Sequence, residues 1–324
     1  MNPPRPPPAR ARARLTLRLS CALAASGLPA PAADGEARSL PLSPHEQVVE
    51  RVAVVPVLAG EPAAVTNRYV ELGDNLNYWD ETAGNWRPSV PEVVLEGHGA
   101  AALRGHQKVR FANQVNDGRG AVHLWTLDGA NFRSSVLGLR YFDAASGQQV
   151  VLATVQDAAG ELLPPNQLIY RDAFEGLRAD VLYTYRSTGL EQDVILREAP
   201  PDPEDFGLLA EATTLEVLTE VFEAPAVTKT VRVLSSAKDP AVRQAMVEPD
   251  FTDEALDFGP FRMGEGRAFS LGEQAREDGL LIGKRWLQPG DGRTVLAEAA
   301  EYWELTPALD RLPDRKSTRL NSSH

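Results

Sequence analysis

Short runs of β-branched and aromatic residues, each followed by a turn signal, fill the chain from Asn67 onward. Such runs are typical of β-strands, and dipeptides such as Asp117-Gly118 and Ser146-Gly147 supply the positive φ that tight turns need. The hairpin expected over Asp180–Arg197 carries apolar residues on both faces, as a strand pair buried between two layers does. The sequence therefore predicts an all-β fold, an antiparallel β-sandwich of one large or two packed modules with a minor helix.

The same pattern places the individual elements. A short helix is expected over Asp239–Met246, because Asp239 can cap it and Pro240 fits the first helical position. Other strands are expected at Arg68–Leu72, Leu76–Trp79, Glu92–Leu95, Lys108–Phe111, Ala121–Leu127, Ser134–Phe142, Gln149–Val155, Gln167–Tyr170, Thr214–Phe222, Thr228–Leu234, Arg267–Leu271, Leu280–Trp286 and Thr294–Leu305.

Prolines at 200, 201 and 203 interrupt the strand pattern. Strand interiors do not tolerate this density of proline, so the segment is the expected internal boundary. It separates a β-sandwich module at 63–199 from residues 204–313, which form either a second β-rich module or a continuation of the first.

The amino terminus has the three parts of a secretory signal. Residues 1–18 are rich in arginine, an apolar stretch runs from Leu19 to Leu28, and Ala30-Pro31-Ala32 offers a cleavage site. We expect a signal peptide at 1–32, cleaved after Ala32 or Ala33, and a linker at 33–62. The only cysteine, Cys21, would leave with this leader, so no disulfide is expected. The predicted location is outside the cytoplasm: periplasmic, cell-surface or secreted.

The carboxyl-terminal residues Asp314–His324 read DRKSTRLNSSH. This string can be back-translated into a sequencing-library adapter, and its basic, serine-rich composition differs from the acidic chain before it. We interpret 314–324 as translated adapter, to be excluded from fold reasoning. The natural chain is then expected to continue beyond Pro313 into further domains.

Charge and motif content narrow the function. A net charge of -12 repels phosphate backbones, so no nucleic-acid partner is expected. No apolar run after the leader is long enough for a transmembrane span. The sequence has no G-x-S-x-G, G-x-G-x-x-G or Walker motif, and His45-Glu46 lacks the second histidine of a zinc helix. Glycoside hydrolysis needs only two suitably placed carboxylates, so a carbohydrate-active enzyme remains open.

Two small groups of residues are candidate ligand sites. Tyr78, Trp79 and Trp86 cluster around a turn, where exposed aromatic rings can stack on sugars; the alternative is cross-strand packing. Asp74, Asn77 and Asp80 offer oxygen ligands that suit calcium; the alternative is an Asx-rich turn. No other cofactor is expected. A second acidic stretch, at 250–257, also offers oxygen ligands for calcium, and it too lacks the residue spacing of a known calcium loop.

A motif in the middle of the chain resembles a known family. It comprises Tyr170–Leu177, then Ala179-Asp180-Val181, then Gly189–Val194. It resembles the amino-terminal β-sandwich region of large exported proteins of the Verrucomicrobia group, where such modules precede β-helix, RHS or propeller-type repeats. The resemblance implies the fold and the exported location, and it implies no catalytic residue.

These observations predict a non-enzymatic structural or ligand-binding module at the amino terminus of a larger exported surface or secreted protein. The alternative is a carbohydrate-active enzyme or its accessory sugar-binding module. The expected partners are a polysaccharide or cell-surface component and the downstream domains of the same chain.

Overall fold

The computed structural model describes residues 15–22, 37–55, 63–248, 250–272 and 278–313. The chain is mostly β, its strands pair antiparallel, and the described part contains only two α-helices, which confirms the all-β prediction. In the same residues no helix is both long and apolar enough to cross a membrane.

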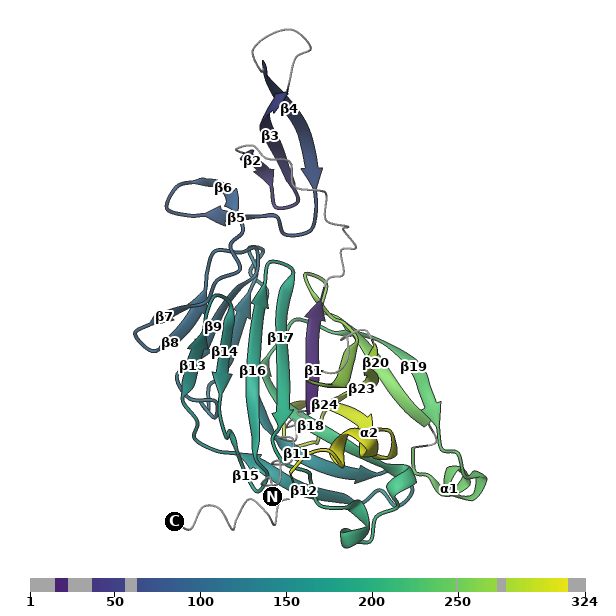
Figure 1. Cartoon of the computed structure of the whole chain (residues 1–324). Helices are drawn as coiled ribbons and strands as arrows, with labels where there is room; N and C mark the ends of the chain where they lie inside the picture. The colour runs from purple at the N-terminus through teal and green to yellow at the C-terminus, as the bar shows by residue number, and fades with distance from the viewer. Residues whose placement is uncertain (1–14, 23–36, 56–62, 249, 273–277, 314–324) are drawn as a thin grey trace, which may run out of the picture.

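Sixteen of the described strands form one continuous sheet (Figure 1). Its path begins with β13 (Gly160–Leu163), β14 (Gln167–Tyr170), β16 (Ala179–Arg186), β17 (Gly189–Leu196), β1 (Leu15–Ala22) and β22 (Gly266–Ser270). It continues through β23 (Leu280–Leu287), β24 (Thr294–Glu301), β18 (Thr213–Glu223), β11 (Asn131–Asp143), β10 (Val122–Trp125), β9 (Lys108–Ala112), β8 (Gly99–Ala102) and β7 (Val94–Glu96). Beside this path, β12 (Gln149–Val155) pairs with β11 and with β15 (Phe174–Glu175).

The sheet folds back so that its two halves pack face to face. The ring of Phe111 on β9 lies 5.5 Å from that of Tyr183 on β16. The buried hydroxyls of Tyr170 and Tyr185 donate to the backbone carbonyls of Ala112 and Gln107 at 2.5 and 2.7 Å, across the same interface. Buried tyrosines need such partners for their hydroxyls. These rings therefore both fill the core and fix how the two layers align.

Smaller elements decorate this sandwich. A three-stranded sheet of β2 (Ala37–Ser43), β3 (Glu46–Val55) and β4 (Ala63–Leu72) projects from one end, next to the hairpin of β5 (Asn77–Asp80) and β6 (Asn85–Pro88) (Figure 1). Another sheet consists of β19 (Thr228–Ser236), β20 (Asp250–Asp257) and β21 (Arg262–Met263). The helices are α1 (Pro240–Ala245) and α2 (Tyr302–Leu309), and two 3-10 turns span Pro203–Phe206 and Ala210–Ala212.

Several expectations need correction. Within 33–62, predicted as a linker with one strand near Val52–Leu58, the structure forms two strands, β2 and β3, because Val48 and Val49 find buried positions within a strand ladder. The strand predicted over Thr294–Leu305 ends at Glu301, where α2 begins. A helix there buries Tyr302, Leu305 and Leu309, whose spacing suits one helical face.

At two predicted boundaries, the proline-rich segment and the end of the leader, strands from both sides belong to the large sheet. β18, which follows the proline-rich segment, pairs with β11, which precedes it, so residues on both sides contribute to one sheet. Residues Leu15–Ala22 of the predicted leader form β1, between β17 and β22. The rest of the leader and the predicted adapter tail at 314–324 lie outside the described residues.

The motif that carries the family resemblance has a structural explanation. Tyr170 is fully buried, and Asp180 receives the backbone N–H of Asp172 at 2.9 Å and Nε of Arg197 at 2.7 Å. Gly176 has a φ of 100°, and a Cβ there would lie 2.6 Å from the carbonyl oxygen of Leu152. Only glycine fits this position without strain. The motif therefore specifies the turn that leads into β16.

Candidate ligand-binding site

The β5–β6 hairpin holds two of the three predicted aromatic residues together. Trp79 and Trp86 face each other across the strand pair, and their rings meet edge-on with centroids 5.3 Å apart. Tyr78 pairs with Arg87 and lies on the opposite face of the hairpin, since side chains alternate along a strand. Trp86 thus packs across the strand pair, as the alternative predicted. Trp79 makes the same contact and also lines a pocket.

Trp79 lines a pocket of about 210 Å³ between the hairpin and the sandwich. Trp125, at the end of β10, lines it too, as do the polar side chains of His106, Lys108 and Thr126. Lys108 is held by Glu81 of the hairpin turn at 3.2 Å. The pocket is smaller than the roughly 300–1,000 Å³ typical of drug-sized ligands, so its dimensions suit a single small ring.

The histidine in this pocket is uncharged near neutral pH. Burial lowers the pKa of His106, and the nearby ring of His45, 5.8 Å away between centroids, lowers it further against the opposing effect of Asp128. Among the described residues, Nδ1 of His106 has no hydrogen-bond partner. A neutral imidazole can both donate and accept a hydrogen bond, as hydroxyl groups of a ligand require.

A polar groove of about 510 Å³ adjoins the pocket on the outer face of β8–β11. Trp125 connects the two, because its ring lies 5.4 Å from the guanidinium of Arg110 and 5.1 Å from the ring of His123, and both of these residues line the groove. Glu96 binds Nε of Arg110 at 3.2 Å, so the groove presents donors and acceptors together. Its other polar side chains are those of His98, Asp117, Arg119 and Arg133.

The predicted calcium residues have other contacts. The side-chain amide of Asn77 is buried and donates to the carbonyls of Ser43 and Glu46 at 2.7 and 3.0 Å, which anchors β5 on the β2–β3 turn. Asp80 accepts two backbone N–H groups of its own turn and binds Arg87 at 2.9 Å. Asp74 lies 4.0 Å from Nδ1 of His45. The structure thus brings these residues near one another as turn and anchor residues, and calcium binding stays a prediction.

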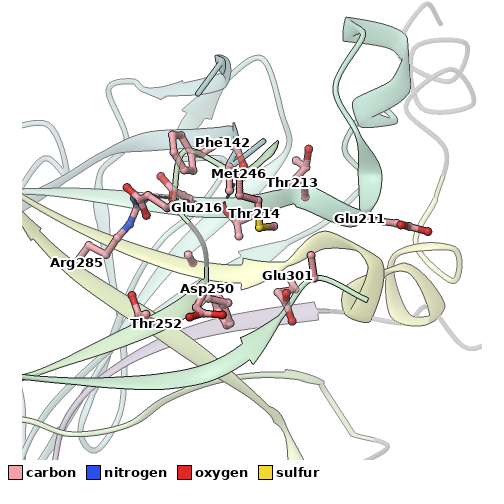
Figure 2. Close-up of a pocket in the computed structure, with 16 residues that line it drawn as sticks. Phe142, Glu211, Thr213, Thr214, Glu216, Met246, Asp250, Thr252, Arg285 and Glu301 are labelled. Carbon is pink, nitrogen blue, oxygen red and sulfur yellow. Dashed lines mark hydrogen bonds and ion pairs between the residues drawn. The ribbon is translucent and has the colours of Figure 1, made fainter. Parts of the chain in front are cut away.

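An acidic cavity is a second candidate site, because its carboxylates could act in catalysis (Figure 2). It lies between β18 and β24 of the large sheet and the segment that leads into β20. Its carboxylates are those of Glu211, Glu216, Glu248, Asp250 and Glu301. This is the setting in which a pair of facing carboxylates for glycoside hydrolysis would be sought.

Four of the cavity's carboxylates, those of Glu216, Glu248, Asp250 and Glu301, are engaged in ion pairs or hydrogen bonds. Fully buried Glu216 binds Nε of Arg140 at 2.6 Å and also binds Arg285, which reaches toward it in Figure 2. Arg285 also holds Glu248 at 2.7 Å and lies 4.6 Å from the ring centroid of Phe142. The free volume is about 30 Å³, which is room for one or two water molecules. The cavity is therefore better explained as the charged seam between two sheets than as a site for a sugar.

Trp79 could be predicted from the sequence, whereas the other residues that complete the pocket could not. His106, Lys108, Trp125 and Thr126 are brought to it by two other loops and strands, at distances in sequence that no local motif spans. One signal was present, because in β10 the buried Val122 and Leu124 alternate with the half-exposed His123 and Trp125. An aromatic residue on the outward side of a strand is a candidate for binding.

Fold and site together define a class, an antiparallel β-sandwich with an aromatic pocket and an adjoining polar groove on one outer face. No protein-family model matches the chain, and no curated protein or solved structure is significantly similar to it.

Proposed function

We propose that this chain is a non-enzymatic ligand-binding module of a larger exported surface or secreted protein, and that its ligand is a saccharide. The observation that carries the proposal is the pocket in which Trp79 and Trp125 both line the space around His106, Lys108 and Thr126. The signal-like leader, and the resemblance of the Tyr170–Val194 motif to exported sandwich modules, support the location.

The chemistry of the pocket matches a sugar ring. Apolar C–H faces of a pyranose pack against indole rings, while its hydroxyls need partners that both donate and accept. Neutral His106 can donate or accept, and Thr126, whose hydroxyl donates to Asp128, can accept. Lys108 provides donors, and Glu81 provides acceptors. Because the chain is acidic, with a net charge of -12, a neutral or mildly charged glycan fits better than a polyanion.

Saccharide binding is favoured over hydrolysis because the acidic cavity is small and its central carboxylate is already paired. Glu216 is held by two arginines, and the space beside it admits only water-sized groups. Catalysis of glycosyl transfer needs an acid and a second carboxylate on either side of a bound sugar ring. A carbohydrate-active enzyme would have to use another pair of acids.

The test is binding of the purified full chain to a glycan array, followed by calorimetric titration with the best ligand. Trp79→Ala and Trp125→Ala should each weaken binding about 10- to 100-fold, since burying an aromatic side chain contributes roughly 1.5–3 kcal/mol. Trp303→Ala is the matched control, because this indole lies under Lys238, 3.6 Å from its ring, and does not line the pocket.

The outcomes separate the alternatives. Binding that the two pocket variants lose and the control keeps, with unchanged thermal unfolding, supports the saccharide site. Binding to no glycan at millimolar concentration, or equal binding by all variants, contradicts it. Release of reducing sugar from a bound glycan would instead support the enzyme alternative.

A further inference from the structure

Three charged or ionisable side chains meet in the dry interior behind the acidic seam. Lys284 on β23 and Asp253 on β20 are each 1% exposed, and Glu298 on β24 is 3% exposed. Nζ of Lys284 lies 2.6 Å from Oδ1 of Asp253. Lys284 and Glu298 are direct partners in the β23–β24 register, so their side chains point to the same face of the sheet.

The trio is surrounded by apolar side chains and by one further buried carboxylate, that of Asp193. Val217 is the register partner of Glu298 on its other side, and Ile282 lies on the same face of β23 as Lys284; both belong to the core. Burial raises the pKa of Glu298 to about 8; Lys284 opposes the shift, and Asp193 and Asp253 add to it. Glu298 is therefore a protonated acid at neutral pH, and among the described residues its Oε1 has no hydrogen-bond partner.

The carboxylate of Asp253 is oriented by three donors. Its Oδ1 accepts both the backbone N–H of Lys284, at 3.0 Å, and the side-chain amine, while its Oδ2 accepts Nε of Arg232 at 2.9 Å. The amine thus contacts, at 2.6 Å, an oxygen that is bonded directly to the carboxyl carbon Cγ. A nucleophile and an electrophile held this way react as if at very high concentration.

We propose that Lys284 and Asp253 join spontaneously through an isopeptide bond once the chain has folded. One proton first passes from Nζ of Lys284 to Oδ1 of Asp253, and the neutral amine then attacks Cγ. The negative charge that develops on Oδ2 is stabilised by Arg232. The C–Oδ1 bond then breaks, and the two protons that leave Nζ end on Oδ1, which departs as water. Glu298 gives one proton to the departing oxygen and takes one from the nitrogen, so it is regenerated. The reaction needs no oxidant or other reactant.

The bond would fasten the junction between two sheets of the fold. The β19–β21 sheet meets the edge of β23 through side chains, with Asp253 and Glu254 accepting the backbone N–H groups of Lys284 and Trp286. Gly283 permits this approach, because a Cβ there would lie 2.2 Å from the carbonyl oxygen of Thr252. A covalent link between Lys284 and Asp253 would keep the two sheets together without a disulfide.

Mass spectrometry of the denatured full chain distinguishes this bond from an ordinary buried ion pair. The cross-linked chain lacks the mass of one water molecule. Trypsin should release a branched product that joins the peptide 244–262, with Asp253, to the peptide 277–285, in which Lys284 escapes cleavage. An unmodified mass, with separate linear peptides, would overturn the proposal whatever any variant does.

Variants assign the roles. Lys284→Ala and Asp253→Ala should restore the full mass, and Glu298→Gln should slow formation at least 10-fold when the cross-linked fraction is followed after refolding. The matched control is Lys229→Ala, which removes an exposed lysine–carboxylate pair between β19 and β20, Lys229 with Glu254 at 3.2 Å, and should leave the water loss unchanged. Formation at the parental rate in Glu298→Gln would remove that residue from the mechanism.

Discussion

Replacing Glu298 with glutamine should change how the stability of the protein depends on pH. The folded-state pKa of Glu298 is raised from 4.5 to about 8, chiefly by burial. A carboxyl whose pKa is raised by folding stabilises the folded state below its unfolded pKa, and that contribution is lost as the pH rises through the folded pKa. The parent chain should therefore weaken between about pH 4.5 and pH 8, whereas the glutamine variant has no proton to lose.

The magnitude follows from the same shift. Each pKa unit corresponds to about 1.4 kcal/mol, and between pH 6 and pH 9 the folded and unfolded states differ in proton binding over roughly two units. The parent should thus lose about 3 kcal/mol of unfolding free energy that Glu298→Gln retains. An isopeptide bond nearby changes the smaller charge effects of Lys284 and Asp253, but it leaves the burial of Glu298, the largest cause, in place.

Urea unfolding at pH 6 and pH 9 measures this difference directly. The control is Glu175→Gln, at an exposed position of β15, which should follow the parent at both values. If the parent and Glu298→Gln lose the same stability between pH 6 and pH 9, Glu298 is not a buried acid with a raised pKa. A parent that gains stability from pH 6 to pH 9 would contradict a pKa of Glu298 that folding raises.

Three further predictions follow from the groove, the motif and the leader. Arg110→Ala should weaken binding of an oligosaccharide about 10-fold while changing monosaccharide binding less than 3-fold, as judged by calorimetry, because the groove lies beside the ring pocket; equal effects on both would contradict two adjacent subsites. Gly176→Ala should destabilise the chain by about 1–3 kcal/mol in urea unfolding, because its φ is 100° and a Cβ would meet a carbonyl oxygen of β12, whereas Gly118→Ala, in open space, should not. Amino-terminal sequencing of chain recovered from the periplasm or medium should begin after Ala32 or Ala33, so the mature chain would lack β1. Recovery of a chain that still begins with the arginine-rich leader, and so keeps β1 between β17 and β22, would contradict the predicted signal peptide.

The strand pattern could be predicted because it depends on local residue spacing. The hairpin of β16 and β17 was predicted to within one residue at each end, since alternating side chains and Gly189 fix both strands and turn. β20 was missed, because its sequence, DFTDEALD, resembles a solvated acidic loop. Its acids are tolerated in a strand only because Lys284 and Arg232, distant in sequence, neutralise Asp253.

The candidate site shows the same limit. Trp79 could be nominated from its exposed turn, but the pocket exists only because the β5–β6 hairpin folds against the end of β10. Trp125 lies far along the sequence from Trp79, and nothing local relates them. Likewise, Asn77 could be read as a metal ligand until its amide was found between two backbone carbonyls of the preceding turn. Local sequence identifies the residue types, and only the packed sheets identify their neighbours.

The indole N–H resonances of the chain's five tryptophans test the central claim most directly. These signals can be assigned with single Trp→Phe variants and followed by ¹⁵N NMR while the best array glycan is added. Saccharide binding in the pocket predicts that the resonances of Trp79 and Trp125 shift with one common affinity, while those of Trp286 and Trp303 stay in place. Shifts confined to Trp286 or Trp303, or no shift at saturating glycan, would contradict a sugar site on this face of the sandwich.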